Sequence, residues 1–445
     1  MERAKLIVKN FGPLKDIEIE VREMVTFIGA QASGKSTLAK LISIFEDDDF
    51  RRSSDATFEA ELRKYNIYSY LSENTFIQYK NSERVYPFTL RFSSGKFEKQ
   101  TIPNIIELFK GIKNEDHDNI KYKTIEGFKF LIKGSIEHSQ FYDTNFETKI
   151  LNLFPEKKQQ TKFINYYYNP ENKQFFKDHL VDEILNILGK EEKFENYLHL
   201  YEALVNSFSN IFLYDSIYIP TERNILEIIS TNVLGLINNN IQIPRYLLNS
   251  GQEYEKAIQT IKELPLSIID KKIKYKREGK SSYIYHNETE KVDLLESASG
   301  LQSIIPILLL VEYSKSLKEK YNFNFVVEEP ELNLYPKAQH ELIKYLIKNC
   351  LFDRKNLILT THSPFVLASI NNLLLAYDKG QKKPKEVNKI INKESWLNPK
   401  NFIAYELKNG KAKKIMNDRL GQISENMIDS VSDTFADEFD KLLDL

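Results

Sequence analysis

The 445-residue chain is poor in cysteine, with Cys350 alone, and contains only 15 glycines and one tryptophan. A single cysteine excludes a disulfide framework within the chain, so we expect a protein of the reducing cytoplasm. Long apolar stretches are also missing. The longest run, residues 304–311, includes a proline and is far too short to cross a bilayer. The chain opens on a strand pattern rather than a signal peptide, and we expect no membrane association.

An excess of charge of one sign is missing as well. Lysine and arginine number 62 against 63 acids, which gives a formal net charge of −1, so no overall basic field would concentrate nucleic acid. Any DNA contact needs a local patch. Residues 379–414 are rich in lysine and could bind DNA phosphates or a partner, or form an ordinary solvated surface. Residues 426–445 are acidic and amphipathic. We expect them to form a docked helix, and the alternative is that they occupy a basic surface on another subunit.

What the sequence does contain is a glycine-spaced loop at residues 29–37, GAQASGKST, which fits the pattern G-x-x-x-x-G-K-[ST]. Glycine lets the backbone approach phosphate closely, and successive amide groups then form an anion-binding nest. The Lys35 amine can reach the β- and γ-phosphates, and the Ser36 hydroxyl can ligate Mg²⁺. The nucleotide-binding residues expected from this loop are Gly29, Ala32, Ser33, Gly34, Lys35, Ser36 and Thr37.

Two further apolar strand patterns end in groups suited to phosphate chemistry. Residues 323–331 read FNFVVEEPE, where Glu328 could hold a metal ion and Glu329 could deprotonate a water molecule. Residues 356–364 read NLILTTHSP, and His362 could hydrogen-bond a γ-phosphate or position that water. Taken alone, these could be an ordinary strand end with solvated acids and a surface histidine.

A second anion-binding position is expected at residues 295–303, LESASGLQS, where small residues precede a long apolar helix. The chain already has one phosphate loop. A second helix start of this kind therefore makes physical sense if it closes on ATP held by another copy. The alternative is a plain helix cap by the hydroxyl of Ser297 or Ser299.

Taken in this order, GAQASGKST, SASGLQS, VVEEPELNLYP and LTTHSP resemble the motifs of an ABC-type ATPase head of the SMC/RecF/OLD class. The opening KLIVKNFGPLKDIEIEV and the stretch SIYIPTERNIL at 216–226 are similar to that class too. The resemblance implies an α/β P-loop NTPase with a mixed β-sheet core, an N-terminal antiparallel β-lobe and a helical insertion. The implied parts are 1–100, the N-terminal lobe with the phosphate loop; 101–210, the insertion; 211–378, the C-terminal part of the ATPase; and 379–445, the lysine-rich segment and acidic tail.

The resemblance also implies roles for single residues, with ATP and Mg²⁺ as cofactors. Ser36 and Glu328 match metal ligands, Glu329 the catalytic base, and His362 the switch histidine. Ser299 and Gly300, with Gln302 beside them, match the signature residues that contact the ATP of the partner subunit. Arg223 is a candidate nucleotide or interface arginine.

Three positions depart from the family pattern. Glu328 stands where aspartate is usual, and its longer side chain could alter the metal geometry. Leu301 replaces the second signature glycine, which puts close backbone approach there in doubt. The glutamine that senses Mg²⁺ is open, because Gln78 and Gln140 both fit.

The expected activity is slow ATP hydrolysis that loosens an ATP-bridged homodimer or a larger assembly. The chain after His362 has no Asp-x-Asp strand pattern of a Toprim nuclease, so any cleavage would come from a separate nuclease-like effector. The layout resembles ATPase subunits of anti-phage defence systems such as PARIS or Septu, with the 101–210 insertion as the candidate for partner recognition. The alternatives are a RecF-like repair or replication clamp that binds DNA, and a stand-alone regulatory ATPase.

Overall fold

A computed structural model describes residues 3–47, 50–51, 56–81, 88–100, 151, 154, 156–167, 183, 214–238, 242–317, 322–351 and 355–444. Most of the insertion expected at 101–210 therefore lies outside the described residues, and so does Gln140. Within that region the structure describes helix α7 (Lys157–Tyr167).

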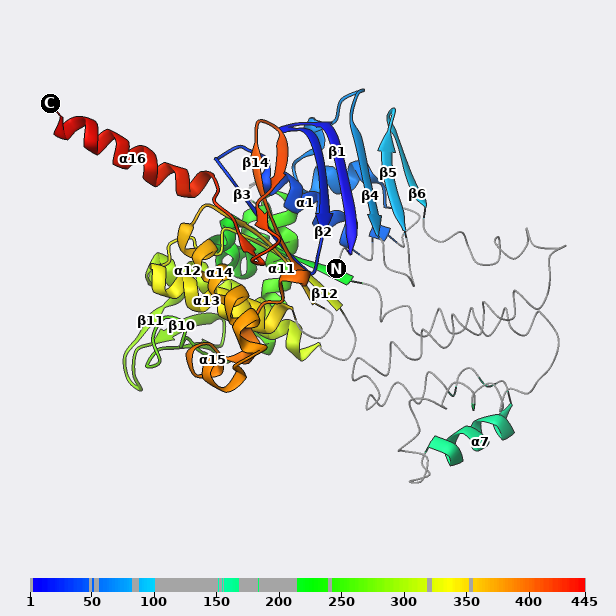
Figure 1. Ribbon diagram of the computed structural model, residues 1–445. Helices are drawn as coiled ribbons and strands as arrows, with labels where there is room; N and C mark the ends of the chain where they lie inside the picture. The colour runs from blue at the N-terminus through cyan, green and yellow to red at the C-terminus, as the bar shows by residue number, and fades with distance from the viewer. Residues whose placement is uncertain are drawn as a thin grey trace.

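The N-terminal lobe is the antiparallel part of a large sheet (Figure 1). Its strands are β1 (Ala4–Phe11), β2 (Leu14–Val21), β4 (Phe76–Asn81), β5 (Thr89–Ser93) and β6 (Lys96–Gln100). Neighbouring strands of this lobe run antiparallel. Buried and more exposed residues roughly alternate along β1 and β2, because one face covers the core. The antiparallel lobe expected from the sequence is confirmed.

The other half of the sheet is mainly parallel and carries the motifs. Its parallel strands, in spatial order, are β14 (Phe402–Lys408), β3 (Met24–Gly29), β13 (Lys355–Thr361), β12 (Asn322–Glu328) and β7 (Tyr214–Ile219). Strand β15 (Lys411–Lys414) pairs antiparallel with β14 and meets β2 in a parallel bridge, which joins the halves into one 11-stranded sheet. The mixed sheet expected from the sequence is confirmed.

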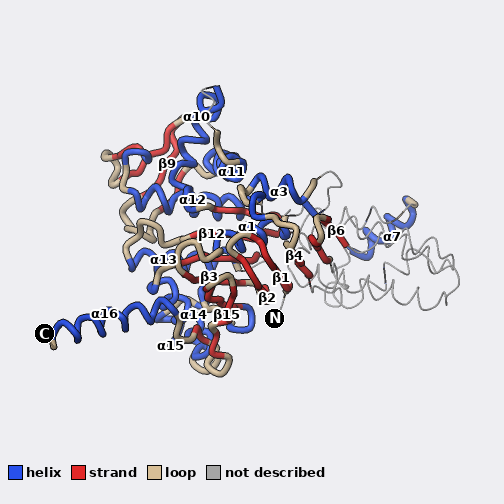
Figure 2. Tube along the Cα trace, turned by 90° about the horizontal axis from the view of Figure 1, so that it is seen from above, coloured by secondary structure: helices blue, strands red, loops and turns tan. Residues whose placement is uncertain are grey.

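Helices cover this parallel region, and strands β3 and β13 are therefore buried along their whole length. Helix α1 (Lys35–Glu46) packs on β7, β12 and β13, and α11 (Arg245–Thr260) packs on α12 (Ser299–Ser316). Helix α13 (Pro336–Cys350) packs on β13 and on α14 (Pro364–Gly380). Figure 2 shows the core strands between α11 and α12 on one side and α14 and α15 (Pro384–Ile390) on the other. Cys350 is buried, and burial raises the pKa of its thiol to about 12.

Smaller elements complete the fold. They are the helices α3 (Phe58–Lys64) and α10 (Leu226–Asn238), the antiparallel strands β8 (Glu263–Pro265), β9 (Lys274–Glu278), β10 (Ser281–Tyr285) and β11 (Lys291–Asp293), the pair β16 (Met416–Asn417) and β17 (Gln422–Ile423), and the 3₁₀ turns η1 (Tyr68–Tyr70), η5 (Thr221–Ile225), η6 (Leu294–Glu296), η7 (Lys393–Ser395) and η8 (Pro399–Asn401). Strands β9 and β10 pair antiparallel with each other. Within the described ranges, no helix is long and apolar enough to cross a membrane.

The last helix, α16 (Met427–Leu443), extends away from the rest of the molecule (Figure 1). A capping box between Asn426 and Asp429 fixes its start. Phe435 and Phe439 are 64% and 62% exposed, and Val431, Leu442 and Leu443 are exposed too. The helix is amphipathic, as expected, and Ile428 in its first turn packs against the core. Beyond that turn its large apolar side chains are exposed, so the expectation that the helix is docked is wrong.

Candidate nucleotide site

The phosphate loop lies between a buried strand and a helix, the context that the sequence predicts. Strand β3 ends at Gly29 and helix α1 begins at Lys35. Gly34 has a φ of 100°, and a Cβ there would lie 2.5 Å from a methyl carbon of Leu14, so this position requires glycine. Of the other loop residues, Ala32 and Ser36 are exposed, Thr37 is buried, and the Ser33 hydroxyl has no hydrogen-bond partner among the described residues.

Lys35 folds back over its own loop. Its Nζ donates to Gly29 O at 2.8 Å and to Ala30 O at 2.9 Å. Burial lowers the pKa of the Lys35 amine, and the carboxylates of Glu329 and Glu328 oppose that shift. The Lys35 amine therefore lies close enough to interact electrostatically with Glu329, the predicted catalytic base, and with Glu328, the predicted metal ligand.

The strands that carry the motifs are parallel neighbours, so their carboxyl ends meet at one edge of the sheet. In register, Glu328 of β12 lies opposite Thr360 of β13, and Thr361 lies opposite Ile28 of β3. This register brings the acidic strand end, the histidine strand end and the phosphate loop together, as the order of motifs predicts.

Glu328 is buried, and its Oε1 has no hydrogen-bond partner among the described residues. Burial raises the pKa of the Glu328 carboxyl, while the Lys40 charge and the nearby hydroxyls of Ser36 and Tyr218 act in the opposite direction. A carboxylate beside a hydroxyl is a donor set that suits Mg²⁺, which takes few protein ligands and completes its shell with phosphate and water. In the described ranges, no group of three or more His, Cys, Asp or Glu forms an all-protein metal site. Ser36 and Glu328 therefore fit an ion bound together with a nucleotide.

Glu329 and His362 form a side-chain pair, with Oε1 of the acid 3.2 Å from Nε2 of the histidine. Both side chains are partly exposed. The Glu329 backbone is left-handed, with a φ of 42°, and its amide donates to Thr360 O at 2.9 Å. Strained non-glycine backbone of this kind is concentrated at functional sites. The two predicted catalytic residues thus lie side by side, and their catalytic roles stay predictions.

Glu331 is a residue that the sequence reading missed. Its Oε1 accepts hydrogen bonds from the Thr361 hydroxyl (2.7 Å) and from the His362 amide (2.8 Å). Burial raises the pKa of the Glu331 carboxyl, and these two donors oppose the shift. Glu331 therefore holds the end of β13 and the backbone of the histidine in place. The signal was the third acid of EEPE, but the sequence alone does not show that the chain turns back after Pro330.

Helix α12 begins at Ser299, which is exposed, and no described side chain caps it. The alternative of a hydroxyl cap is wrong, because the Ser297 hydroxyl donates to Leu294 O instead. A Cβ on Gly300 would lie 2.7 Å from Asn333 O, so this position needs glycine. This contact is with the chain's own loop, so the doubt that Leu301 raises about close approach to a nucleotide stays open. The uncapped helix start is suited to an anion.

Gln302 supports this segment from inside the chain. Its Nε2 donates to Leu295 O at 2.9 Å and to Ser297 O at 2.8 Å, which holds the residues before the helix in place. Its predicted contact with a nucleotide stays a prediction. The Mg²⁺-sensing glutamine also stays open, because Gln78 lies within β4 and Gln140 is outside the described residues.

Arg223 is not placed as a nucleotide or interface arginine would be, and this expectation is corrected. Its side chain is 0% exposed. Nε donates to Ser303 O (2.8 Å), Nη1 to Glu328 O (2.7 Å) and Pro220 O (3.1 Å), and Nη2 to Glu329 O (2.8 Å). Burial lowers the pKa of the guanidinium to about 10, so it is still charged at neutral pH. The arginine is an internal tie between backbone segments.

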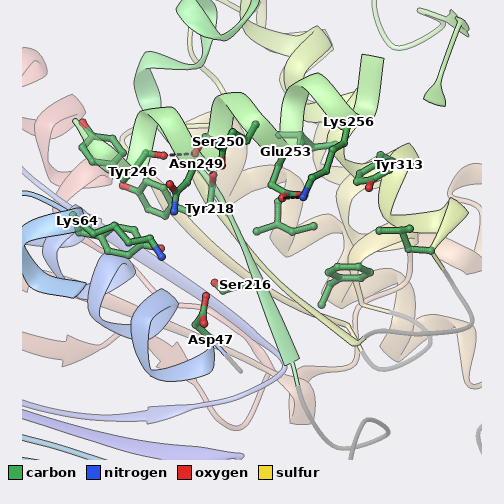
Figure 3. Close-up of a pocket in the computed structure, with 16 residues that line it drawn as sticks. Asp47, Lys64, Ser216, Tyr218, Tyr246, Asn249, Ser250, Glu253, Lys256 and Tyr313 are labelled. Atoms are coloured by element: carbon green, nitrogen blue, oxygen red, sulfur yellow. Dashed lines mark hydrogen bonds and ion pairs between the residues drawn. The ribbon is translucent and has the colours of Figure 1, made fainter. Parts of the chain in front are cut away.

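A separate cavity of about 490 Å³ lies between α11, α12 and β7 (Figure 3). Tyr218, Tyr246 and Asn249 line it, together with the Glu253–Lys256 ion pair. None of the residues that line it is a predicted phosphate-loop, metal or catalytic residue. It is a second cavity rather than the nucleotide site.

The phosphate loop, the open helix start, the acidic strand end and the histidine, arranged around a mixed sheet, form the site of a P-loop ATPase and resemble the ABC-type heads of the SMC/RecF class. The chain belongs to the AAA ATPase domain family, whose model matches residues 1–367. None of the curated proteins matches it in sequence.

Solved structures of head domains are similar at low identity. The Smc head domain of Pyrococcus furiosus, solved with an extended coiled coil and bound to the C-terminal domain of ScpA, is 13% identical over 93% of this chain and 96% of its own, with a TM-score of 0.33. The SMC head domain of Thermotoga maritima is 11% identical over 93% and 98%, with a TM-score of 0.35. The recombination mediator RecF, solved with ATPrS, is 12% identical over 93% and 99%, with a TM-score of 0.31. Scores this low carry no weight of their own, and the assignment rests on the family model and the site.

Proposed function

We propose that the protein binds and hydrolyses ATP at a site shared between two copies of the chain. Lys35 and its loop would hold the phosphates, Ser36 and Glu328 would hold Mg²⁺, and Ser299 would approach the nucleotide of the other copy. The metal, when bound, neutralises phosphate charge. The observation that carries this proposal is the start of α12, an exposed helix N-terminus without a side-chain cap among the described residues, on a chain that already has a phosphate loop.

Exposed aromatic side chains beside the site support closure against another surface. Tyr335 follows the loop after Glu329 and is 78% exposed, and Phe365 follows His362 and is 50% exposed. Large exposed apolar side chains near a site are typical of an interaction surface. Closure of two copies on this face would cover both rings.

The Glu329–His362 pair supports hydrolysis at this site. Glu329 would accept the proton of the attacking water, and the histidine Nε2, 3.2 Å away, would hold the carboxylate in position. Loss of the terminal phosphate removes the group that both copies bind, so the dimer loosens. We expect this turnover to be slow, as befits a conformational clamp.

We further propose that this change gates a separate nuclease-like effector in bacterial anti-phage defence, in the cytoplasm. The support is α16, whose exposed Phe435 and Phe439 offer an apolar face for a partner. Its acids make nucleic acid an unfavourable partner for the same face, because they repel phosphate.

A RecF-like clamp that binds DNA is the second candidate. The observation that favours it is a row of exposed lysines at the end of α14 and on α15, namely Lys379, Lys382, Lys383, Lys385 and Lys389. Such a row could bind backbone phosphates. DNA retention that needs ATP and falls steeply with salt would favour this candidate, and co-purification of a nuclease-like protein would favour the first.

Sedimentation velocity of the Glu329→Gln variant tests the shared site. With ATP and Mg²⁺ we expect a dimer or larger assembly that is absent with EDTA. A sedimentation coefficient unchanged by ATP and Mg²⁺ would contradict a site built from two copies.

A further inference from the structure

A single guanidinium links the two parts of the chain that the proposed function assigns to different ATP molecules. Arg223 Nε binds Ser303 O in the second turn of α12, whose start would face the ATP of the other copy. Nη1 and Nη2 bind Glu328 O and Glu329 O, at the strand end that serves the chain's own ATP.

Two further contacts join the same parts. Asn333 Nδ2 donates to Ser303 Oγ at 3.0 Å. The backbone of Gly300 lies so close to Asn333 O that a Cβ would come within 2.7 Å of it. The first turns of α12 and the loop at 328–333 are therefore in contact at several points and can shift together.

The shape of arginine matters here. The planar guanidinium presents its donors in a fixed fork, so one side chain satisfies carbonyl groups on α12 and on the strand end at once. A lysine in its place keeps a positive charge but offers a compact ammonium with no such fork. Glu329 depends on this support, because its left-handed backbone, φ 42°, persists only when its surroundings hold it.

We propose that Arg223 is a positioning residue that couples the two ATP sites of the dimer. Through it, a shift of Glu329 in one site is passed to α12 and so to the other site. This inference rests on the proposed function. It also predicts positive cooperativity in ATP, because each chain contributes to both sites.

The test compares Arg223→Lys with Arg277→Lys. Arg277 is a matched control, because its side chain is only 8% exposed but its Nη1 binds Glu227 Oε1 and Ser282 Oγ, both at 2.7 Å, rather than the loop at 328–333. We expect R223K to lower kcat roughly ten- to a hundredfold with KM within about threefold, because misplacement of a catalytic group acts mainly on turnover.

Cooperativity and hydrogen exchange separate coupling from a merely structural role. The Hill coefficient should fall from above one, with a limit of about two for two sites, to one in R223K. In the nucleotide-free protein, amide exchange should rise together at 299–304 and 328–334. R277K should change none of these quantities. R223K with wild-type turnover and Hill coefficient, or a wild-type protein with a Hill coefficient of one, would overturn the inference.

If R223K does not fold, Ser303→Ala tests the same coupling between α12 and the loop at 328–333. It removes the hydroxyl that accepts from Asn333, and Ser314→Ala is its control, because Ser314 is buried in the same helix and its hydroxyl donates to Val311 O. We expect S303A to lower the Hill coefficient and S314A to leave it unchanged, and equal coefficients would overturn the inference.

The turnover of the Glu329→Gln variant is measured alongside. Normal turnover in E329Q refutes the catalytic role that the proposed function gives Glu329, whereas an inactive E329Q beside a normal R223K or S303A refutes only the coupling.

Discussion

Glu329 and His362 lie at the ends of neighbouring parallel strands, with Oε1 of the acid 3.2 Å from Nε2 of the histidine. The acid reaches this position through a left-handed backbone, φ 42°, which costs about 1–3 kcal/mol in a residue other than glycine. Two hydrogen bonds hold it there: the Glu329 amide donates to Thr360 O, and Arg223 Nη2 donates to Glu329 O. The strained backbone therefore belongs to the acid whose carboxylate lies beside the histidine.

Replacing Glu329 by glutamine should remove the base and keep the shape. We expect turnover to fall by about 10²- to 10⁴-fold, the usual contribution of a general base, while ATP affinity stays near that of the wild type. Phosphate release and equilibrium binding measure the two effects. Glu341→Gln, on the surface of α13, is the control. Wild-type turnover in E329Q would place the base elsewhere.

Replacing Lys35 by alanine should weaken ATP binding by at least about tenfold, because a hydrogen bond to a charged group contributes about 1.5–3 kcal/mol. Titration with a fluorescent ATP analogue gives the affinity. Lys64→Ala is the control, since Lys64 forms a partly exposed ion pair with Glu61 and is not part of the phosphate loop. Equal affinities in the wild type and K35A would show that the loop does not bind phosphate.

The buried Glu331 makes a prediction about pH. Burial raises the pKa of its carboxyl, so the folded protein binds this proton more tightly than the unfolded chain does. Its ionisation therefore costs stability as pH rises above the ordinary value of 4.5 through the raised pKa. Glu331→Gln avoids that cost.

The free energy of unfolding of E331Q relative to the wild type should thus be most favourable at pH 7 and become less so as pH falls toward 4.5. Urea unfolding at a series of pH values measures it. A relative stability of E331Q that grows on acidification has the opposite sign and would show that Glu331 is stabilised in its charged form.

The exposed face of α16 makes a prediction about stability. Phe435→Ser combined with Phe439→Ser should change the free energy of unfolding by no more than about 0.5 kcal/mol, because neither ring is covered in the described structure. Phe58→Ala, in the core, should cost about 3–5 kcal/mol. A large loss of stability from the α16 double variant would mean that the helix packs against the molecule after all.

The sequence predicted the mixed sheet and the gathering of motifs well, because both follow from local patterns. Parallel strands place their carboxyl ends at one edge, so the loop before Lys35, the acids at 328–329 and His362 had to meet there. The glycine spacing carries similar information, since Gly34 and Gly300 stand where a side chain does not fit.

The sequence did not predict contacts that depend on distant backbone. The partners of Arg223 are carbonyl groups at positions 220, 303, 328 and 329, and carbonyls have no sequence signature. Glu331 was missed for the same reason, because its partners come from β13. The exposed position of α16 could not be predicted from the sequence either, since an amphipathic pattern shows that one face is apolar but not what covers that face.

The central claim is tested most directly by mixing two variants that damage opposite halves of the shared site. Lys35→Ala removes the phosphate loop amine, and Ser299→Arg places a bulky side chain at the open start of α12. Gln252→Arg on α11 controls for the added arginine. Each of the first two variants alone should be inactive, and a mixed dimer would contain one intact site.

We predict that the mixture regains ATP turnover, at most about a quarter of the wild-type rate, because half of randomly formed dimers are mixed and each has one working site of two. Wild-type turnover by S299R alone, unaltered by the addition of K35A, would contradict the account.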